Sequence, residues 1–97
     1  MSIFDRPQKG YTDEEFIARG KHAQVLLNDD ILNSILEDAE FSLILNWSET
    51  DGHETDKRER AWMGIQSLSI IRGQLQAAVN DGAVAETRLE VELEELE

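Results

Sequence analysis

The amino-acid sequence predicts an all-α fold, a three-helix arrangement with a long third helix and an acidic C-terminal extension. Two observations favour helices, and a third favours a folded chain. The chain of 97 residues contains a single proline, the residue that most strongly disrupts a helix interior. Apolar residues recur three and four positions apart, which is the spacing of one helix face. A hydrophobic content of 40% is typical of a folded domain and argues against global disorder.

The chain divides into three segments by composition. Residues 1–11 are expected to form an irregular N-terminal arm, because they hold Pro7 and Gly10 and no periodic apolar pattern. Residues 12–82 are expected to form a helical domain. Residues 83–97 are expected to form an acidic C-terminal extension, since they hold six glutamates against one arginine.

The first helix should begin at Thr12. Thr12 and Glu15 have the spacing of a capping box, and Tyr11 and Phe16 hold the flanking positions of a hydrophobic staple. Gly20 interrupts the apolar face of this helix. It indicates either a close contact with another helix or a soft spot.

The second helix should occupy roughly residues 30–47. Before it, Asn28 suits a left-handed C-terminal position, and Asp29 or Asp30 can cap the helix that follows. One apolar stripe recurs at helical spacing, and three further apolar residues lie off it: Phe41, Ile44 and Leu45. A helix that is apolar on more than one side is expected to be buried against two neighbours or against a partner chain.

The third helix should begin near Thr55 or Asp56, after a loop of turn-forming residues, and end at Asn80-Asp81-Gly82. Gly64 and Ser67 add a small-residue patch where another backbone could approach. The main buried seam of this helix is expected to consist of Trp62, Ile65, Leu68 and Leu75. Replacing Leu68 by alanine would then cost about 2–5 kcal/mol if the side chain is fully buried.

The tail has two patterns. Leu89, Leu93 and Leu96 have helical spacing, whereas Leu89, Val91 and Leu93 alternate with glutamates as in a strand. The helix propensity of glutamate favours a helix, although like charges at that spacing repel each other.

Charge and composition exclude several classes of protein. The net charge is −12, from 21 acidic residues against 9 Lys and Arg. This argues against a nucleic-acid-binding module and against electrostatic attachment to anionic membranes. The absence of cysteine excludes disulfides, thiolate metal sites and a cysteine nucleophile. Because no apolar run could span a bilayer and no secretion signal opens the chain, we expect a soluble intracellular protein.

No motif predicts catalysis or a metal site. Several carboxylates surround His53 in the loop over residues 48–55, but an EF-hand alignment on Gly52 puts Trp47 and Arg58 at the first and last ligand positions. The two histidines lack the spacing of a zinc site, and neither pairs with a serine in a recognisable arrangement. We therefore expect no enzymatic activity, no cofactor and no functional metal.

The candidate functional residues are instead residues of interaction surfaces. Arg58 and Arg60, with Trp62 as a stacking surface, could contact an anion or a nucleotide, but ion pairs with neighbouring carboxylates are the favoured interpretation. The full set of candidate interaction residues is Phe41, Ile44, Leu45, Arg58, Arg60, Trp62, Glu90 and Glu94.

Three short motifs resemble small helical proteins encoded by tailed bacteriophages. They are Arg19-Gly20-Lys21-His22-Ala23 leading into Leu27-Asn28-Asp29, the helix start Thr55-Asp56-Lys57-Arg58-Glu59-Arg60-Ala61, and Arg72-Gly73-Gln74-Leu75 followed by Asn80-Asp81-Gly82. The resemblance covers about two thirds of the chain. It implies a phage setting, in the virion or the host cytoplasm, and carries no functional residue over to this chain.

We expect a non-enzymatic phage-type binding or assembly protein that acts through helical protein–protein contacts. Its expected partner is a second copy of itself, with a phage structural protein or a basic host protein as a further partner, and no nucleic acid or membrane. The alternative is an acidic inhibitor that imitates the phosphates of DNA and occupies a basic groove on a host nucleic-acid-binding or defence protein. Association of apolar faces would tolerate moderate salt, whereas DNA mimicry would weaken steeply as salt rises.

Overall fold

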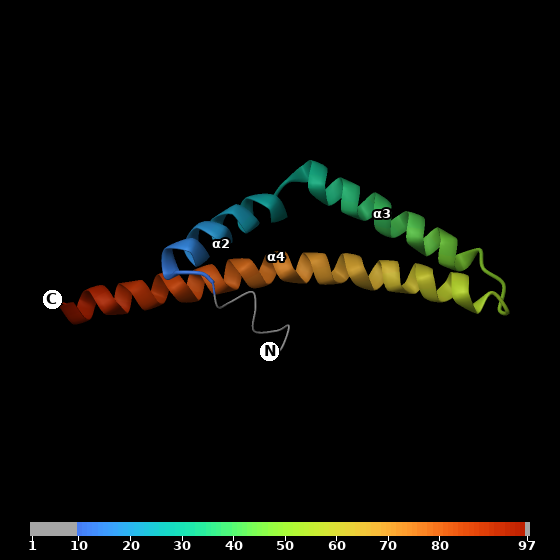
Figure 1. Ribbon diagram of the computed structural model, residues 1–97. Helices are drawn as coiled ribbons and strands as arrows, with labels where there is room; N and C mark the ends of the chain where they lie inside the picture. The colour runs from blue at the N-terminus through green and yellow to red at the C-terminus, as the bar shows by residue number, and fades with distance from the viewer. Residues whose placement is uncertain (1–9, 97) are drawn as a thin grey trace. The chain divides into compact units, whose positions relative to one another are not determined.

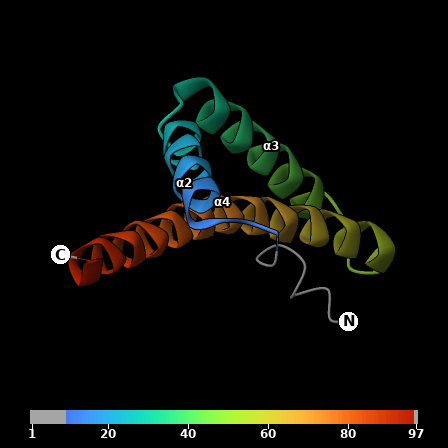
Figure 2. The same ribbon diagram turned by 60° about the vertical axis from the view of Figure 1, so that its left-hand side comes forward.

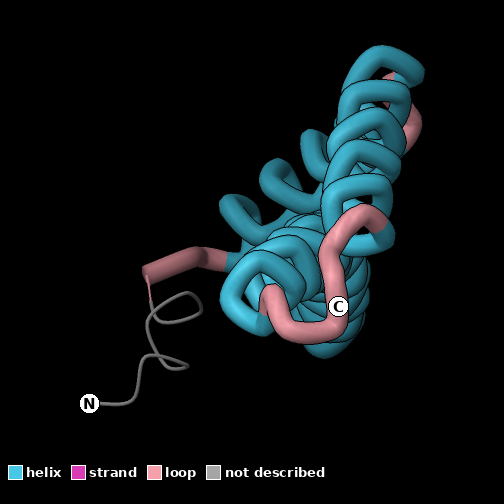
Figure 3. Tube along the Cα trace, turned by 90° about the vertical axis from the view of Figure 1, so that its right-hand side faces the viewer, coloured by secondary structure: helices cyan, strands magenta, loops and turns pink. Residues whose placement is uncertain are grey.

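The computed structural model describes residues 10–96 (Figure 1). It contains three α-helices: α2 (Asp13–Leu27), α3 (Asp30–Ser48) and α4 (Thr55–Leu96). Figure 3 shows helices joined by loops, with no strand between residues 10 and 96. The all-α prediction with a long third helix is confirmed. The predicted arm lies outside the described residues, except for Gly10 and Tyr11.

The helices form two compact units. One unit consists of two segments, namely the described residues up to Val25 and the described residues from Leu75 onward. The other unit is Leu26–Gln74. The long helix α4 contributes to both, so its second half pairs with α2 and its first half pairs with α3.

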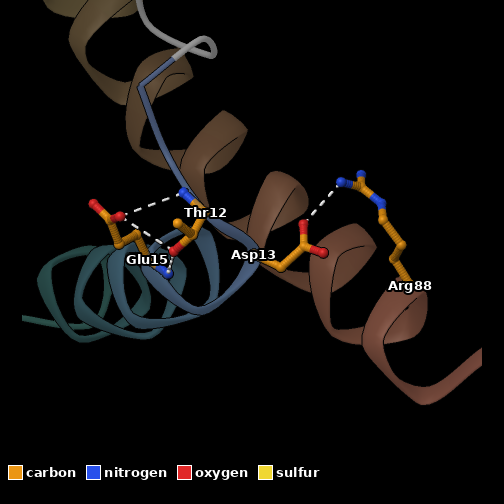
Figure 4. Close-up of polar contacts among 4 residues, drawn as sticks. All are labelled: Thr12, Asp13, Glu15 and Arg88. Carbon is orange, nitrogen blue, oxygen red and sulfur yellow. Dashed lines mark hydrogen bonds and ion pairs between the residues drawn. The ribbon is translucent and has the colours of Figure 1, made fainter. Parts of the chain in front are cut away.

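The start of α2 is the predicted capping box. The hydroxyl of Thr12 accepts a hydrogen bond from the Glu15 backbone N–H at 3.2 Å, and the Thr12 N–H donates to the Glu15 carboxylate at 3.4 Å (Figure 4). The predicted staple is present as an edge-to-face contact between the rings of Tyr11 and Phe16, whose centroids are 5.2 Å apart. Both devices fix the direction in which the chain enters the helix.

The break between α2 and α3 differs from the prediction in one respect. Asp29 is the N-cap of α3, and its carboxylate accepts a hydrogen bond from the Leu32 N–H at 2.7 Å. Asn28 does not take the left-handed conformation, since no described residue has a positive φ. Instead, the side-chain amide of Asn33 donates to the carbonyl of Leu27 at 2.8 Å. A side chain thus satisfies a helix-terminal carbonyl that a left-handed residue would otherwise serve.

The predicted end of the third helix at Asn80-Asp81-Gly82 is wrong, because α4 continues through these residues to Leu96. Gly82 has helical backbone geometry, and its lack of a Cβ serves packing rather than a turn. Asn80 remains helical and accepts a hydrogen bond from the side-chain amide of Gln76 at 3.1 Å. The helix predicted for the tail is confirmed, and the alternative strand pattern is not used.

In the first unit, α2 runs antiparallel to the second half of α4 through very small residues. A Cβ added at Gly20 would lie 2.9 Å from the carbonyl oxygen of Ala78 and 3.1 Å from the Cα of Gly82. The buried alanines Ala23 and Ala85 belong to the same unit. Of the two explanations for Gly20, the structure therefore shows the close helix contact.

In the second unit, α3 runs antiparallel to the first half of α4, as Figures 1 and 2 both show. Leu36 and Ala61 are buried there. Gly64 faces the side chain of Leu43, whose nearest methyl would lie 2.8 Å from an added Cβ. The small-residue patch therefore admits a leucine side chain and not another backbone. An ion pair between Arg72 and Glu40, at 2.7 Å, joins the same two helices.

The buried seam predicted for α4 is only partly correct. Trp62 is 54% exposed, and Ile65, Leu68 and Leu75 are half-buried rather than buried. The buried positions of this helix are alanines and Gly82, because small side chains allow the helix axes to approach and large ones are left at the edges of the contact. The expected cost of Leu68→Ala accordingly falls below the range of about 2–5 kcal/mol for fully buried leucines.

Because α2 and α4 approach closely at one glycine of α4 and not at another, two glycine-to-alanine substitutions in this helix should change the stability in opposite directions. Gly82→Ala should destabilise the fold by about 1–3 kcal/mol, because the new Cβ would lie 2.9 Å from the Phe16 carbonyl oxygen. Gly73→Ala should stabilise it by up to about 1 kcal/mol through helix propensity, because nothing lies within 4 Å of an added Cβ there. Urea unfolding measures both, and a shift of the two variants in the same direction would contradict the packing of the first unit.

Candidate interaction surfaces

The helix α3 has apolar residues both at the positions that pack against α4 and at exposed positions. At 3.6 residues per turn, Leu32, Leu36 and Leu43 share the side that packs against α4, where Leu36 is buried and the other two are half-buried. Phe41 is 62% exposed. The exposed apolar residues of this helix are Ile31, Ile35, Phe41, Ile44, Leu45 and Trp47. The structure thus places the predicted interaction residues Phe41, Ile44 and Leu45 outside the core.

The core itself is small. Among the described residues, the buried hydrophobic ones are Leu36 and four alanines, namely Ala23, Ala61, Ala78 and Ala85. No large side chain of residues 10–96 is fully buried. Exposed apolar patches on a folded chain are typical of interaction sites.

Arg58 and Trp62 lie together, and Arg60 lies apart from them. The guanidinium of Arg58 lies over the ring of Trp47, 5.0 Å from its centroid, in the geometry of a cation–π contact. Arg58, Trp47 and Trp62 line an open hollow of about 310 Å³. Arg60 lines a separate hollow with Lys57. The arginine–tryptophan group therefore exists, but Arg58 already contacts an aromatic ring of its own chain.

The acidic loop between α3 and α4 is closed by its own hydrogen bonds. The Glu54 carboxylate accepts a hydrogen bond from the Asp51 N–H at 3.0 Å and pairs with Lys57 at 2.7 Å. The hydrogen bond from the Asp51 backbone, and next the pairing with Lys57, lower the pKa of Glu54 from its ordinary value of 4.5. Between residues 10 and 96, no group of three or more His, Asp or Glu side chains could hold a metal ion.

The acidic end of α4 carries Glu90 and Glu94 on exposed positions. The only base of this segment, Arg88, pairs with Asp13 of α2 at 2.8 Å (Figure 4). An exposed pair of this kind contributes at most about 1 kcal/mol. Glu90 and Glu94 belong to the first unit, whereas Phe41, Ile44 and Leu45 belong to the other.

Sequence reasoning missed an exposed apolar series on α4. Met63, Ile70, Val84 and Val91 are all more than two-fifths exposed. With Ala77, they lie seven residues apart along one helix. The signal that could have found them is this interval of seven, which α4 displays once it is recognised as a single helix through residues 80–82.

No family model matches this chain, and no curated protein or solved structure matches it either. Within the described part of the chain, no helix is both long enough and apolar enough to cross a membrane.

The closed loop predicts how Glu54 responds to pH. Because its pKa is lowered in the folded chain, its hydrogen bonds are fully present above the ordinary glutamate pKa and are lost as pH falls through the lower folded value. In an NMR titration, the Glu54 carboxyl should have its midpoint below 4.5, and the Asp51 amide signal should move at the same pH. Lys57→Ala is the matched control and should retain a pKa below the ordinary value, since the hydrogen bond from the Asp51 N–H is the largest single cause of the shift. A midpoint at or above 4.5 would contradict the loop geometry.

Proposed function

We propose that this chain is a non-enzymatic binding or assembly protein that acts through helical protein–protein contacts and associates with copies of itself. The observation that carries this proposal is the imbalance between the core and the surface. Only one large side chain among the described residues, Leu36, is buried, while sixteen large hydrophobic residues are exposed.

Stability arguments support association. Burying a side chain of the size of Val, Leu, Ile or Phe stabilises by about 1.5–3 kcal/mol, and a single chain of this length depends on such burial. Alanines contribute less to a core because they remove less apolar area from water. Contacts with another chain would cover the large side chains that the two units leave exposed.

The polar chemistry of the described residues supports a non-enzymatic role. None of the charged side chains between residues 10 and 96 is buried, and the shifted carboxyl of Glu54 is held by contacts within and beside its own loop. Catalytic acids and bases usually depend on burial or close charge partners to shift their pKa. An interaction role needs no such group, and apolar helix faces are sufficient for it.

The distribution of charge favours self-association over imitation of DNA. A DNA mimic needs carboxylates spread over the surface that enters a basic groove. In α4, only Arg72, Asp81 and Glu86 carry charge between Trp62 and Thr87. The phage setting implied by the sequence resemblance is part of the same proposal, with the virion or the host cytoplasm as the place of assembly.

Self-association predicts a mass above that of one chain. Light scattering coupled to size exclusion, at micromolar concentration, should give at least twice the chain mass of 11.0 kDa. Raising the salt concentration should strengthen the oligomer or leave it unchanged, because it screens repulsion between subunits of net charge −12. A single-chain mass in both low and moderate salt would overturn the proposal.

A further inference from the structure

The outward side of α4 carries little charge over more than half of the helix, since Asp81 at its edge is the one charged residue on it between Trp62 and Thr87. Twelve residues between Trp62 and Thr87 share this side, opposite the one that holds Ala61, Gly82 and the half-buried leucines, and all twelve are exposed. They are Trp62, Met63, Gln66, Ser69, Ile70, Gly73, Gln76, Ala77, Asn80, Ala83, Val84 and Thr87. We name these twelve residues the uncharged face. Their lack of charge is notable because 31% of the chain is charged.

The uncharged face contains a seven-residue repeat of apolar side chains. Met63, Ile70, Ala77 and Val84 follow one another at this interval, and Val91 continues the series into the tail. Met63 is 65%, Ile70 61% and Val84 58% exposed. A repeat of seven keeps an apolar line on one side of a helix that winds around another helix. The series therefore has the form of a contact line for a second long helix.

Charge selects a second copy of the chain as the occupant. Two copies of net charge −12 repel each other wherever their carboxylates meet, and the uncharged face lets two such chains approach without that contact. A basic partner would gain little from this face, because Asp81 at its edge is the one carboxylate that it offers between Trp62 and Thr87. A second copy of α4 offers a line of the same length, the same spacing and the same lack of charge.

The two ends of α4 select an antiparallel pairing. In its first two turns the bases Lys57, Arg58 and Arg60 outnumber the acids Asp56 and Glu59. Near its end lie only acidic charges, Glu90, Glu92, Glu94 and Glu95. An antiparallel pair centred on Ala77 brings the basic end of each helix to the acidic end of the other. A parallel pair would instead place the acidic ends side by side, which is unfavourable.

We propose that two copies of this chain pair through the uncharged face of α4, antiparallel and centred on Ala77. Met63 then lies opposite Val91 of the other copy, because each is fourteen positions from Ala77. Ile70 lies opposite Val84 in the same way, seven positions from the centre. The pairing rests on the proposed self-association and specifies which surface and which orientation it uses.

Single cysteines test the pairing directly, since the chain has no cysteine of its own. Under mild oxidation, Ala77→Cys should cross-link with itself. Met63→Cys and Val91→Cys should cross-link when mixed, but Met63→Cys alone should not, because two copies of it would be about 42 Å apart at 1.5 Å per residue. A mixture of Ile70→Cys and Val84→Cys repeats the test at a second pair of positions. Circular dichroism checks that each variant keeps its helices.

The outcomes separate this inference from the proposed function. A multi-chain mass with cross-linking of Met63→Cys alone would show a parallel pair, and a multi-chain mass without any of the expected cross-links would show a different surface. Either result overturns the pairing and leaves self-association standing. A single-chain mass overturns both.

A charge substitution provides an independent test of the same surface. The double variant Ile70→Glu with Val84→Glu should give a single-chain mass, because it places four carboxylates in each paired interface. His22→Glu adds a carboxylate on an exposed position of α2 and should keep the mass of the parent. An unchanged mass for the double variant would overturn the pairing.

Discussion

The closeness of helix backbones is the constraint on which the rest of this structure depends. Where α2 meets α4, at Gly20 and Gly82, the two helix backbones leave no room for a methyl group between them. Such a close approach requires alanine or glycine along the contact. Besides the two glycines, the buried residues Ala78 and Ala85 meet this requirement. Because the inner positions are taken by the smallest residues, the large apolar side chains lie on other sides of the helices. The exposed apolar surfaces follow from the way the core is built.

The sequence predicted the elements better than it predicted their roles. The capping box of Thr12 and Glu15 and the cap at Asp29 are local hydrogen-bonding devices, and each could be read from residues three positions apart. The end predicted at Asn80-Asp81-Gly82 was wrong because glycine has two uses, which local sequence does not distinguish. Glycine can form a turn, or it can allow a neighbouring backbone to approach. At Gly82 the second use applies, and only the positions of Phe16 and Gly20 in the folded chain show it.

The candidate surfaces also divide into those that could be predicted from local sequence and those that depend on the fold. Phe41, Ile44 and Leu45 were predictable because they lie off the stripe of their own helix, which is a property of one segment. The series from Met63 to Val91 could not be recognised while α4 was expected to end at residue 80. Trp62 was assigned to the core because it shares the helical spacing of Ile65 and Leu68, yet it is 54% exposed.

The two units also differ in how far apart their members lie along the chain. Residues 26–74 are contiguous, and the ion pair between Glu40 and Arg72 closes a stretch of only 32 positions. The contact between Asp13 and Arg88 spans 75 positions and joins the two ends of the chain. Contacts between distant residues form more slowly, because ordering a longer loop costs more entropy. During synthesis, the hairpin of α3 and the first half of α4 can therefore assemble before α2 acquires its partner, because the second half of α4 leaves the ribosome after them.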